Sequence, residues 1–273
     1  MTSLVAWIAV DQRSASAVYI ATDSRISWDG TQAVRAHNWD RGRKTFASER
    51  TSEIFGYVGD VLFPALALPT ITTPLGRGPA GSVNTGMPGA ISDVVRGAWS
   101  EVPQEERRET YLVHCSRVGE NVQWQFGAQI MHISNGALDW STTFLTLPEH
   151  SARLEFLGSG ASGLKATHAR WVPIGKADHA RSRTSRAVFS SFCDALHDKE
   201  DPKSGGAPQL VGLYRKGPGR TFGISWNSQT YIAGSQANSL VTSNIEYRNQ
   251  LFERVDAGGK LIQGAQRHAG RPT

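Results

Sequence analysis

The sequence predicts an α+β protein built as a four-layer αββα sandwich, in which two antiparallel sheets lie between two layers of helices. The first reason is the order of the expected elements: strands, one helix, further strands, two helices and a final group of strands. The second is the turn signals between successive strands, such as Gly119-Glu120 and Asn135-Gly136, since short turns join antiparallel neighbours. A chain of 273 residues with 39% hydrophobic residues and eight tryptophans can also bury a sizeable core.

Four strands are expected within the first sixty residues. The continuous apolar run at residues 2–10 is typical of a strand that is buried on both faces. A second strand at residues 17–21 leads into Thr22-Asp23-Ser24-Arg25, and shorter strands are expected at residues 44–47 and 54–59. The last of these strands contains two glycines, which often mark the close approach of another backbone or of a ligand.

The middle of the chain predicts a long loop followed by a helix. Pro64 and Pro69 limit any helix that begins near Asp60, and residues 69–89 are rich in Pro, Gly, Thr and Ser. A clear helix then opens at Pro88 and ends at Pro103. Its apolar residues recur with helical spacing on a single face, at Ile91, Val94, Val95, Ala98, Trp99 and Val102.

Strands dominate the second half of the sequence. They are expected at residues 110–117, 121–132, 137–147 and 153–157. Two helices follow, around residues 164–172 and 181–198, and an antiparallel meander closes the fold at residues 208–214, 221–226 and 229–233.

We divide the chain into one domain over residues 1–240 and a C-terminal extension over residues 241–273. A short helix is expected at residues 243–254. From Gly258 onward the sequence is Gly-rich and polar, so we expect this extension to be partly flexible.

Composition narrows the classes of function. The net charge is +5 and the basic residues are scattered, so we expect no nucleic-acid partner. No apolar run approaches the roughly 18 residues that span a bilayer, so we expect no membrane contact. Two cysteines and dispersed histidines predict neither a disulfide framework nor a metal site, and we expect no cofactor. The N-terminal apolar run is short and leads into Asp11-Gln12-Arg13, so we expect no secretory signal and a cytoplasmic location.

A glycine cluster offers one alternative function. Gly158, Gly160 and Gly163 match the G-x-G-x-x-G pattern between a strand and a helix, and Asp178 lies near the spacing of a ribose-binding acid. However, the cluster sits among elements expected to be antiparallel, and no second parallel strand precedes Asp178. Dinucleotide binding is therefore the weaker hypothesis.

Thr2 is the candidate catalytic residue around which the functional interpretation is built. Removal of Met1 would leave a threonine with a hydroxyl nucleophile and a free α-amine, whose pKa is ordinarily about 7.7–8.0. One residue would then hold both a nucleophile and its base. The plainer interpretation is a start methionine followed by a small residue.

Together with five later segments, Thr2 resembles the start of a proteasome β-type subunit, a family of N-terminal-nucleophile (Ntn) hydrolases. The resemblance spans about residues 2–235, and its segments occur in the order of that family. The segments are Thr2, Asp23-Ser24-Arg25, Lys44 before Phe46, Gly56-Tyr57-Val58-Gly59-Asp60, Gly158-Ser159-Gly160, and Asp201 with Ser204-Gly205-Gly206. The resemblance also implies the αββα sandwich of the Ntn hydrolase fold.

The resemblance implies a role for each matched residue. Thr2 would be the nucleophile, Asp23 and Lys44 its activating pair, and Gly56 the donor of a backbone N–H to the oxyanion. Around the threonine amine and hydroxyl would lie Ser159, Asp201 and Ser204. Without the resemblance, Asp23 and Lys44 could form a surface ion pair, and Asp201 and Ser204 could belong to a polar loop.

The expected function is hydrolysis of peptide bonds by acyl transfer to Thr2. By resemblance, the partners would be a peptide or unfolded protein substrate, further copies of the chain in a homo-oligomeric ring, and an ATPase. Two alternatives stay open: an Ntn amidase that acts on a small amide, and a catalytically silent scaffold subunit.

Overall fold

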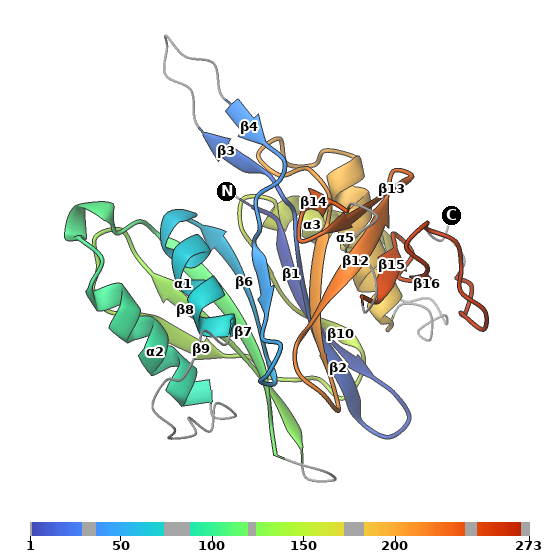
Figure 1. Ribbon diagram of the computed structural model, residues 1–273, viewed down its shortest axis with the longest axis horizontal. Coiled ribbons are helices and arrows are strands. Elements are labelled where there is room, and N and C mark those ends of the chain that lie inside the picture. Colours follow the sequence, from blue (N-terminus) through green and yellow to red (C-terminus); the bar gives the residue numbers. More distant parts are fainter. Residues whose placement is uncertain are drawn as a thin grey trace.

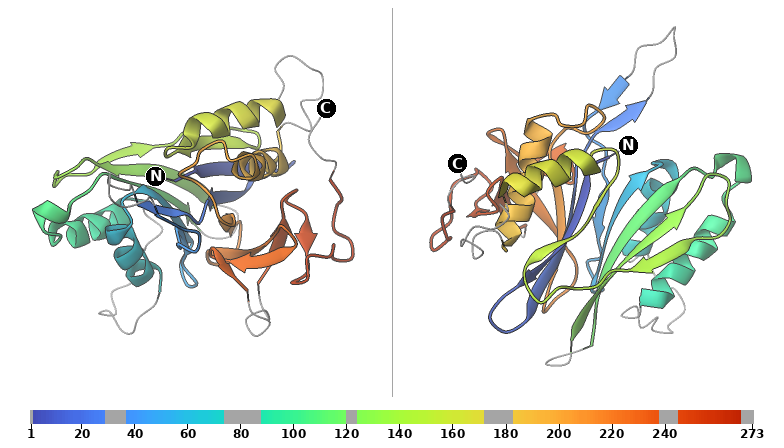
Figure 2. Two further views of the ribbon diagram at one scale, coloured as in Figure 1. Left: turned by 90° about the horizontal axis from the view of Figure 1, so that it is seen from above. Right: turned by 180° about the vertical axis from the view of Figure 1, so that it is seen from behind.

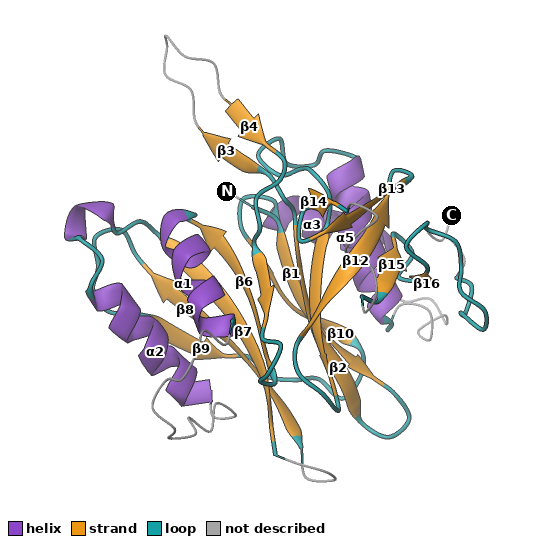
Figure 3. Cartoon of the chain, in the orientation of Figure 1, coloured by secondary structure: helices purple, strands orange, loops and turns teal. Residues whose placement is uncertain are grey.

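The computed structural model describes residues 2–28, 37–73, 88–119, 124–171, 183–237 and 245–268. Over these ranges the chain forms two large sheets that pack face to face, with helices on their outer sides (Figure 1). A small separate hairpin of β3 (Ile26–Trp28) and β4 (His37–Trp39) projects from one end of the molecule. Figure 3 shows how much of the described chain is strand.

The larger sheet has nine strands, and β1 (Leu4–Val10) lies inside it. The strand order is β10-β1-β2-β11-β12-β13-β14, with β15 beside β12 and β16 beside β15. All pairings are antiparallel except that of β12 with β15. The other strands are β2 (Ala15–Thr22), β10 (Ala152–Leu157), β11 (Gln209–Tyr214), β12 (Arg220–Trp226), β13 (Gln229–Ile232), β14 (Ser235–Gln236), β15 (Tyr247–Asn249) and β16 (Arg254–Val255).

The smaller sheet is an antiparallel meander of five strands that pair in chain order. It contains β5 (Thr45–Ala47), β6 (Glu53–Gly59), β7 (Thr110–Val118), β8 (Gln125–Ile133) and β9 (Ser141–Phe144). Thus β5, which follows Lys44, belongs to a different sheet from β2, which precedes Asp23.

Two helices lie on the outer side of each sheet, as the two views of Figure 2 show. Helices α1 (Leu62–Thr72) and α2 (Pro88–Ser100) lie on the five-stranded sheet, and a 3-10 turn (Gln104–Glu106) follows them. Helices α3 (Ala161–Trp171) and α5 (Ser185–His197) lie on the nine-stranded sheet. No helix in the described part of the chain is long and apolar enough to cross a bilayer.

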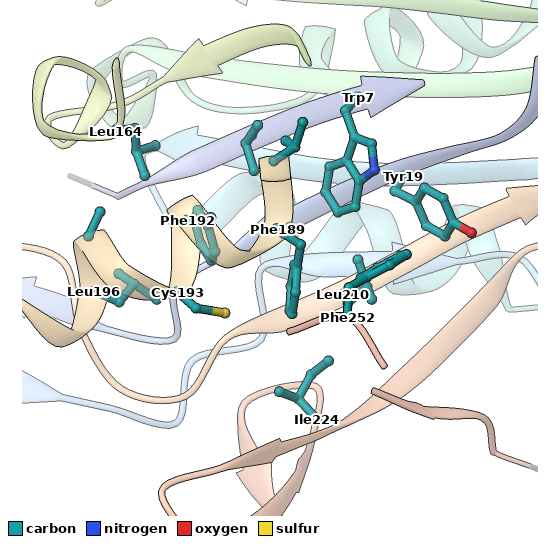
Figure 4. Close-up of a cluster of buried hydrophobic side chains, with 14 of the residues drawn as sticks. Trp7, Tyr19, Leu164, Phe189, Phe192, Cys193, Leu196, Leu210, Ile224 and Phe252 are labelled. Atoms are coloured by element: carbon teal, nitrogen blue, oxygen red, sulfur yellow. The ribbon is translucent and has the colours of Figure 1, made fainter. Parts of the chain in front are cut away.

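The buried side chains form three clusters, and β1 contributes to two of them. Leu4 and Ala6 face the cluster between the two sheets, whereas Val5 and Trp7 face α3 and α5. Figure 4 shows the cluster between β1 and the helices α3 and α5, where Trp7 stacks on Tyr19 with ring centroids 5.0 Å apart. Because both faces of β1 are covered, its sequence is a continuous apolar run rather than an alternating one.

The structure is mostly β, which corrects the predicted α+β class and the four-layer αββα sandwich. The described residues contain four α-helices of 11 to 13 residues each. Nine strands at about 4.8 Å spacing span roughly 40 Å, whereas two helices side by side cover only about 20 Å. The edge strands β9 and β14 are accordingly largely exposed, and the helices do not form complete layers.

Two further expectations about single elements were wrong. The short helix predicted at residues 243–254 is absent from the described residues 245–254, where β15 and the first residue of β16 lie instead. A loop was predicted from residue 69, but α1 continues through Pro69 to Thr72. The remainder of that predicted loop, residues 74–87, lies outside the described residues.

Candidate active site

Thr2 lies two residues before β1, the strand that pairs with β10 on one side and β2 on the other. Its side chain is 1% exposed. Its backbone N–H donates to Ser159 Oγ at 3.3 Å. The carbonyl of Thr2 lies against the turn that follows β10, because a Cβ on Gly158 would come within 1.8 Å of Thr2 O. The predicted nucleophile therefore lies in a buried position that β10 and its turn define.

Lys44 and Asp23 meet beside Thr2 from the two different sheets. Lys44 Nζ donates to Thr2 Oγ1 and to Asp23 Oδ1, each at 2.9 Å, and also to the Arg25 carbonyl. Both side chains of the Lys44–Asp23 pair are at most 1% exposed. The pair is therefore a buried one, unlike the surface ion pair that was the alternative interpretation.

Backbone donors hold the Asp23 carboxylate in place. Its Oδ1 accepts the Ser3 N–H at 3.1 Å, and its Oδ2 accepts the N–H groups of Arg25 and Gly205, each at 3.0 Å. Burial lowers the pKa of Lys44 below its usual range, and the neighbouring Asp23 carboxylate opposes that shift. A carboxylate fixed in this way orients the ammonium group toward Thr2 Oγ1.

Ser159, Asp201 and Ser204 form a second polar group next to the Thr2 nitrogen. Asp201 Oδ2 accepts from Ser159 Oγ at 2.6 Å and from Ser204 Oγ at 2.8 Å. Burial raises the pKa of Asp201, but these two hydrogen bonds and one from the Lys203 N–H outweigh it, so the pKa lies below its ordinary value. Asp201 is therefore poised to remain ionised near the Thr2 nitrogen.

The structure directs the Gly56 N–H toward β7, within the five-stranded sheet. In β6 the Tyr57 N–H donates to the Lys44 carbonyl, toward β5. Because successive N–H groups of a strand point to opposite sides, the Gly56 N–H points to β7, where Val113 lies opposite. A Cβ on Gly56 would come within 2.6 Å of the Ile20 side chain, so this glycine allows the two sheets to pack closely.

Two polar residues of the site were not among the predicted ones. Ser3 Oγ donates to Ser204 Oγ at 2.9 Å, and Gln209 contacts the backbone of both Asp23 and Lys44. Both residues are at most 3% exposed. Gln209 begins the otherwise apolar strand β11, and a polar residue in that position is only a weak sequence signal of a functional site. Its contacts with Asp23 and Lys44 depend on long-range strand pairing.

The glycine cluster serves the threonine site in this fold. The dinucleotide-binding alternative requires parallel strands, but β10 pairs antiparallel with β1. Gly158 adopts a positive φ of 92° and leaves room for Thr2 O, while Gly160 lies against the Ser3 side chain. Asp178 lies outside the described residues. Among the residues that are described, no group of three or more His, Cys, Asp and Glu is placed to hold a metal ion.

A hollow of about 690 Å³ lies beside this network. Its lining includes Arg25, Ser204, Gly205, Trp226 and Tyr231, whereas Thr2 is not among the lining residues. The size lies in the range of small-molecule pockets, which is roughly 300–1,000 Å³.

Two solved structures are distantly similar to this chain. One is Anbu from Hyphomicrobium sp. strain MC1, with 12% identity, a TM-score of 0.48, and coverage of 77% of this chain and 82% of that chain. The other is a Gly-1 mutant of Anbu from the same strain, with 14% identity, a TM-score of 0.44, and coverage of 78% and 81%. No family model matches the chain, and no curated protein matches it. Since both TM-scores are below 0.5, neither structure supports a function for this chain.

Proposed function

We propose that the chain is an N-terminal threonine hydrolase that cleaves peptide bonds, with Thr2 as the nucleophile once the Met1–Thr2 bond is broken. One observation carries the proposal: Lys44 Nζ lies 2.9 Å from both Thr2 Oγ1 and Asp23 Oδ1 in a buried site. A threonine hydroxyl is a weak nucleophile unless its negative charge is stabilised and a base accepts its proton. Lys44 supplies the first function, and the freed α-amine of Thr2 supplies the second.

The proposed reaction has two stages. In the first, the Thr2 hydroxyl proton moves to the α-amine while Oγ1 attacks the substrate carbonyl, with Lys44 stabilising the charge that develops on Oγ1. The protonated amine then donates a proton to the leaving amine, and an ester remains on Thr2. In the second stage a water molecule gives its proton to the α-amine and attacks the ester. The product carboxylic acid leaves, and the Thr2 hydroxyl is restored.

Ser159 and Asp201 would hold the amine for both stages. The Thr2 nitrogen is already 3.3 Å from Ser159 Oγ, which in turn donates to Asp201 at 2.6 Å. An ionised carboxylate one hydroxyl away favours the protonated form of the amine after it has accepted the Thr2 proton. We assign no oxyanion role to Gly56, because its N–H is directed toward β7.

We also propose, as the sequence resemblance implies, a cytoplasmic homo-oligomeric ring that acts on peptides or unfolded protein, with an ATPase as a partner. Light scattering on the purified protein tests the ring. A particle of several times 29.7 kDa is expected, whereas a monodisperse monomer would contradict this part of the proposal.

The nucleophile is tested by intact mass before and after reaction with a peptide epoxyketone, a reagent that requires both a hydroxyl and a free amine on one residue. We expect a protein that lacks Met1 and gains one inhibitor, while Thr2→Ala gains none. Thr70→Ala, which alters an exposed helix threonine, is the matched control and should gain one inhibitor. Retained Met1 together with no adduct would overturn the mechanism and favour the silent scaffold.

A small amide is the second candidate substrate, because the same Thr2, Lys44 and Asp23 groups would cleave it. The peptidase and the amidase differ in how their activity depends on the length of the substrate. Turnover that increases from an aminoacyl amide to an extended peptide supports the peptidase, whereas turnover of small amides alone supports the amidase.

A further inference from the structure

Gln209 is a fully buried glutamine that contacts the main chain on either side of the Lys44–Asp23 pair. We propose that Gln209 is a positioning residue: its carboxamide fixes the separation of the Asp23 and Lys44 segments, so that the Lys44 ammonium reaches Thr2 Oγ1. The inference rests on the proposed function for its catalytic meaning, but the geometry can be tested independently.

The carboxamide makes four hydrogen bonds. Its Oε1 accepts from the Lys44 N–H at 3.0 Å and from Thr45 Oγ1 at 3.3 Å. Its Nε2 donates to the Asp23 carbonyl at 3.2 Å and to the Gly42 carbonyl at 2.6 Å. Gln209 therefore binds the main chain of both partners of the ion pair.

The partners determine which way the amide points. Two carbonyl oxygens face Nε2, which has two hydrogens to donate, and an N–H and a hydroxyl face Oε1, which has two lone pairs. A flipped amide would bring its oxygen against two carbonyl oxygens. Because every polar atom of the side chain is used, loss of the carboxamide would leave buried backbone groups without partners.

The topology explains why such a connection is needed. Asp23 follows β2 of the nine-stranded sheet, and Lys44 precedes β5 of the five-stranded sheet. The chain between them projects outward as the β3–β4 hairpin, so sequence proximity does not set their spacing (Figure 1). Gln209 begins β11, beside Thr22 of β2, and reaches across to the segment that enters β5.

A glycine in the turn between β13 and β14, Gly234, leaves room for the Gln209 side chain. Gly234 has a φ of 82°, and a Cβ there would lie 3.0 Å from Gln209 Nε2 and 2.8 Å from Ser24 Oγ. The turn between β13 and β14 thus closes over the carboxamide and keeps water from its hydrogen bonds.

Gln209→Leu tests the proposal, with Gln129→Leu as the matched control. Gln129 is also a glutamine with 1% exposure, but it lies in β8 and contacts His114 rather than the site. We expect Gln209→Leu to slow epoxyketone adduct formation on Thr2 at least tenfold. We also expect the NMR pKa of Lys44 Nζ to change, because both its burial and its distance from the Asp23 carboxylate would change. Gln129→Leu should lower Tm without either change.

Gln209→Glu provides a signature that loss of stability alone would not produce. A protonated carboxyl keeps one donor for the two carbonyl oxygens, whereas an ionised carboxylate repels both. We therefore expect the ratio of variant to wild-type adduct rate to fall at least tenfold between pH 6 and pH 8.5. Taking the ratio removes the pH dependence that both proteins share through the Thr2 amine.

Two results would overturn the proposal. One is an unchanged Lys44 pKa in a folded Gln209→Leu protein; the other is a pH-independent rate ratio for Gln209→Glu. If wild-type Thr2 forms no adduct at all, the proposed function fails, and the Lys44 titration in Gln209→Leu still decides whether Gln209 sets the geometry.

Discussion

At the residue scale, the site depends on a lysine that the interior would ordinarily exclude. An uncompensated buried ammonium is costly, so Lys44 needs an acceptor on each side of its Nζ. Asp23, Thr2 and the Arg25 carbonyl supply them. Asp23 in turn is held by three backbone N–H groups, so neither charge of the pair depends on the other alone.

Glu53, at the start of β6, shows what burial does to a carboxyl that forms no ion pair with any described residue. It is 2% exposed, and burial raises its pKa from 4.5 to about 7, against the opposing effect of a hydrogen bond from Thr51. Between these two values the folded protein binds a proton that the unfolded chain has lost. Stability due to this group is therefore present below pH 4.5 and is lost as the pH rises through 7.

Replacement of Glu53 by glutamine should abolish that dependence. We expect Glu53→Gln to be more stable than wild type by about 1–3 kcal/mol at pH 8 and to approach wild type near pH 4. Urea unfolding at pH 4, 5.5 and 8 measures the difference. Exposed Glu49→Gln is the control, and a difference for Glu53→Gln that stays constant over this range would refute the assignment.

At the scale of elements, the turn between β10 and α3 positions the N-terminal strand. Gly158 at this turn has a φ of 92°, and Thr2 O occupies the space where its side chain would be. Ser159, the next residue, accepts from the Thr2 N–H. The turn therefore contributes both the room for Thr2 and one of its polar contacts.

Gly158→Ala should damage the site as well as the fold. Strain at a positive φ costs about 1–2 kcal/mol, and the clash with Thr2 O adds to it, so we expect a loss above about 3 kcal/mol. Gly136→Ala separates the two effects, because Gly136 has a φ of 70° but nothing within 4 Å of a Cβ. We expect the control to lose only the strain energy and to keep Thr2 reactive in the intact-mass experiment. Equal losses for both variants would show that the contact with Thr2 O is unimportant.

At the scale of the whole molecule, residues far along the chain complete the core behind β1. Phe252 lies between β15 and β16, is 7% exposed, and packs with ring centroids 5.9 Å from Trp7 and 5.4 Å from Tyr19. The described part of the C-terminal extension also adds β15 to the nine-stranded sheet through β12. The N-terminal strand that carries Thr2 is thus backed by the C-terminal segment (Figure 4).

Phe252→Ala should therefore destabilise the whole protein by about 3–5 kcal/mol, as large-to-small changes of buried aromatics do. Urea unfolding followed by tryptophan fluorescence measures the change. Phe144→Ala is the control, since Phe144 is 66% exposed and its loss should cost less than about 0.5 kcal/mol. A loss below about 1 kcal/mol for Phe252→Ala would mean that this segment is not part of the core.

Local sequence patterns were enough to predict the features that depend on neighbouring residues. Apolar runs located β1, β2, β5, β6 and the closing strands, and the Pro88–Pro103 interval located α2, because side-chain periodicity and turn chemistry act over a few positions. The family resemblance of the sequence named six residues that lie together in the structure: Thr2, Asp23, Lys44, Ser159, Asp201 and Ser204.

Long-range pairing, in contrast, sets the features that depend on which strands are neighbours and in which register they pair. The register of β6 directs the Gly56 N–H to β7, and the pairing of β11 with β2 brings Gln209 to the Lys44–Asp23 pair. Likewise, β15 forms because it pairs with β12, β16 forms because it pairs with β15, and the mostly β class reflects how much of the chain is paired as strand. A shift of one residue in pairing reverses the direction of every side chain, and no local pattern records it.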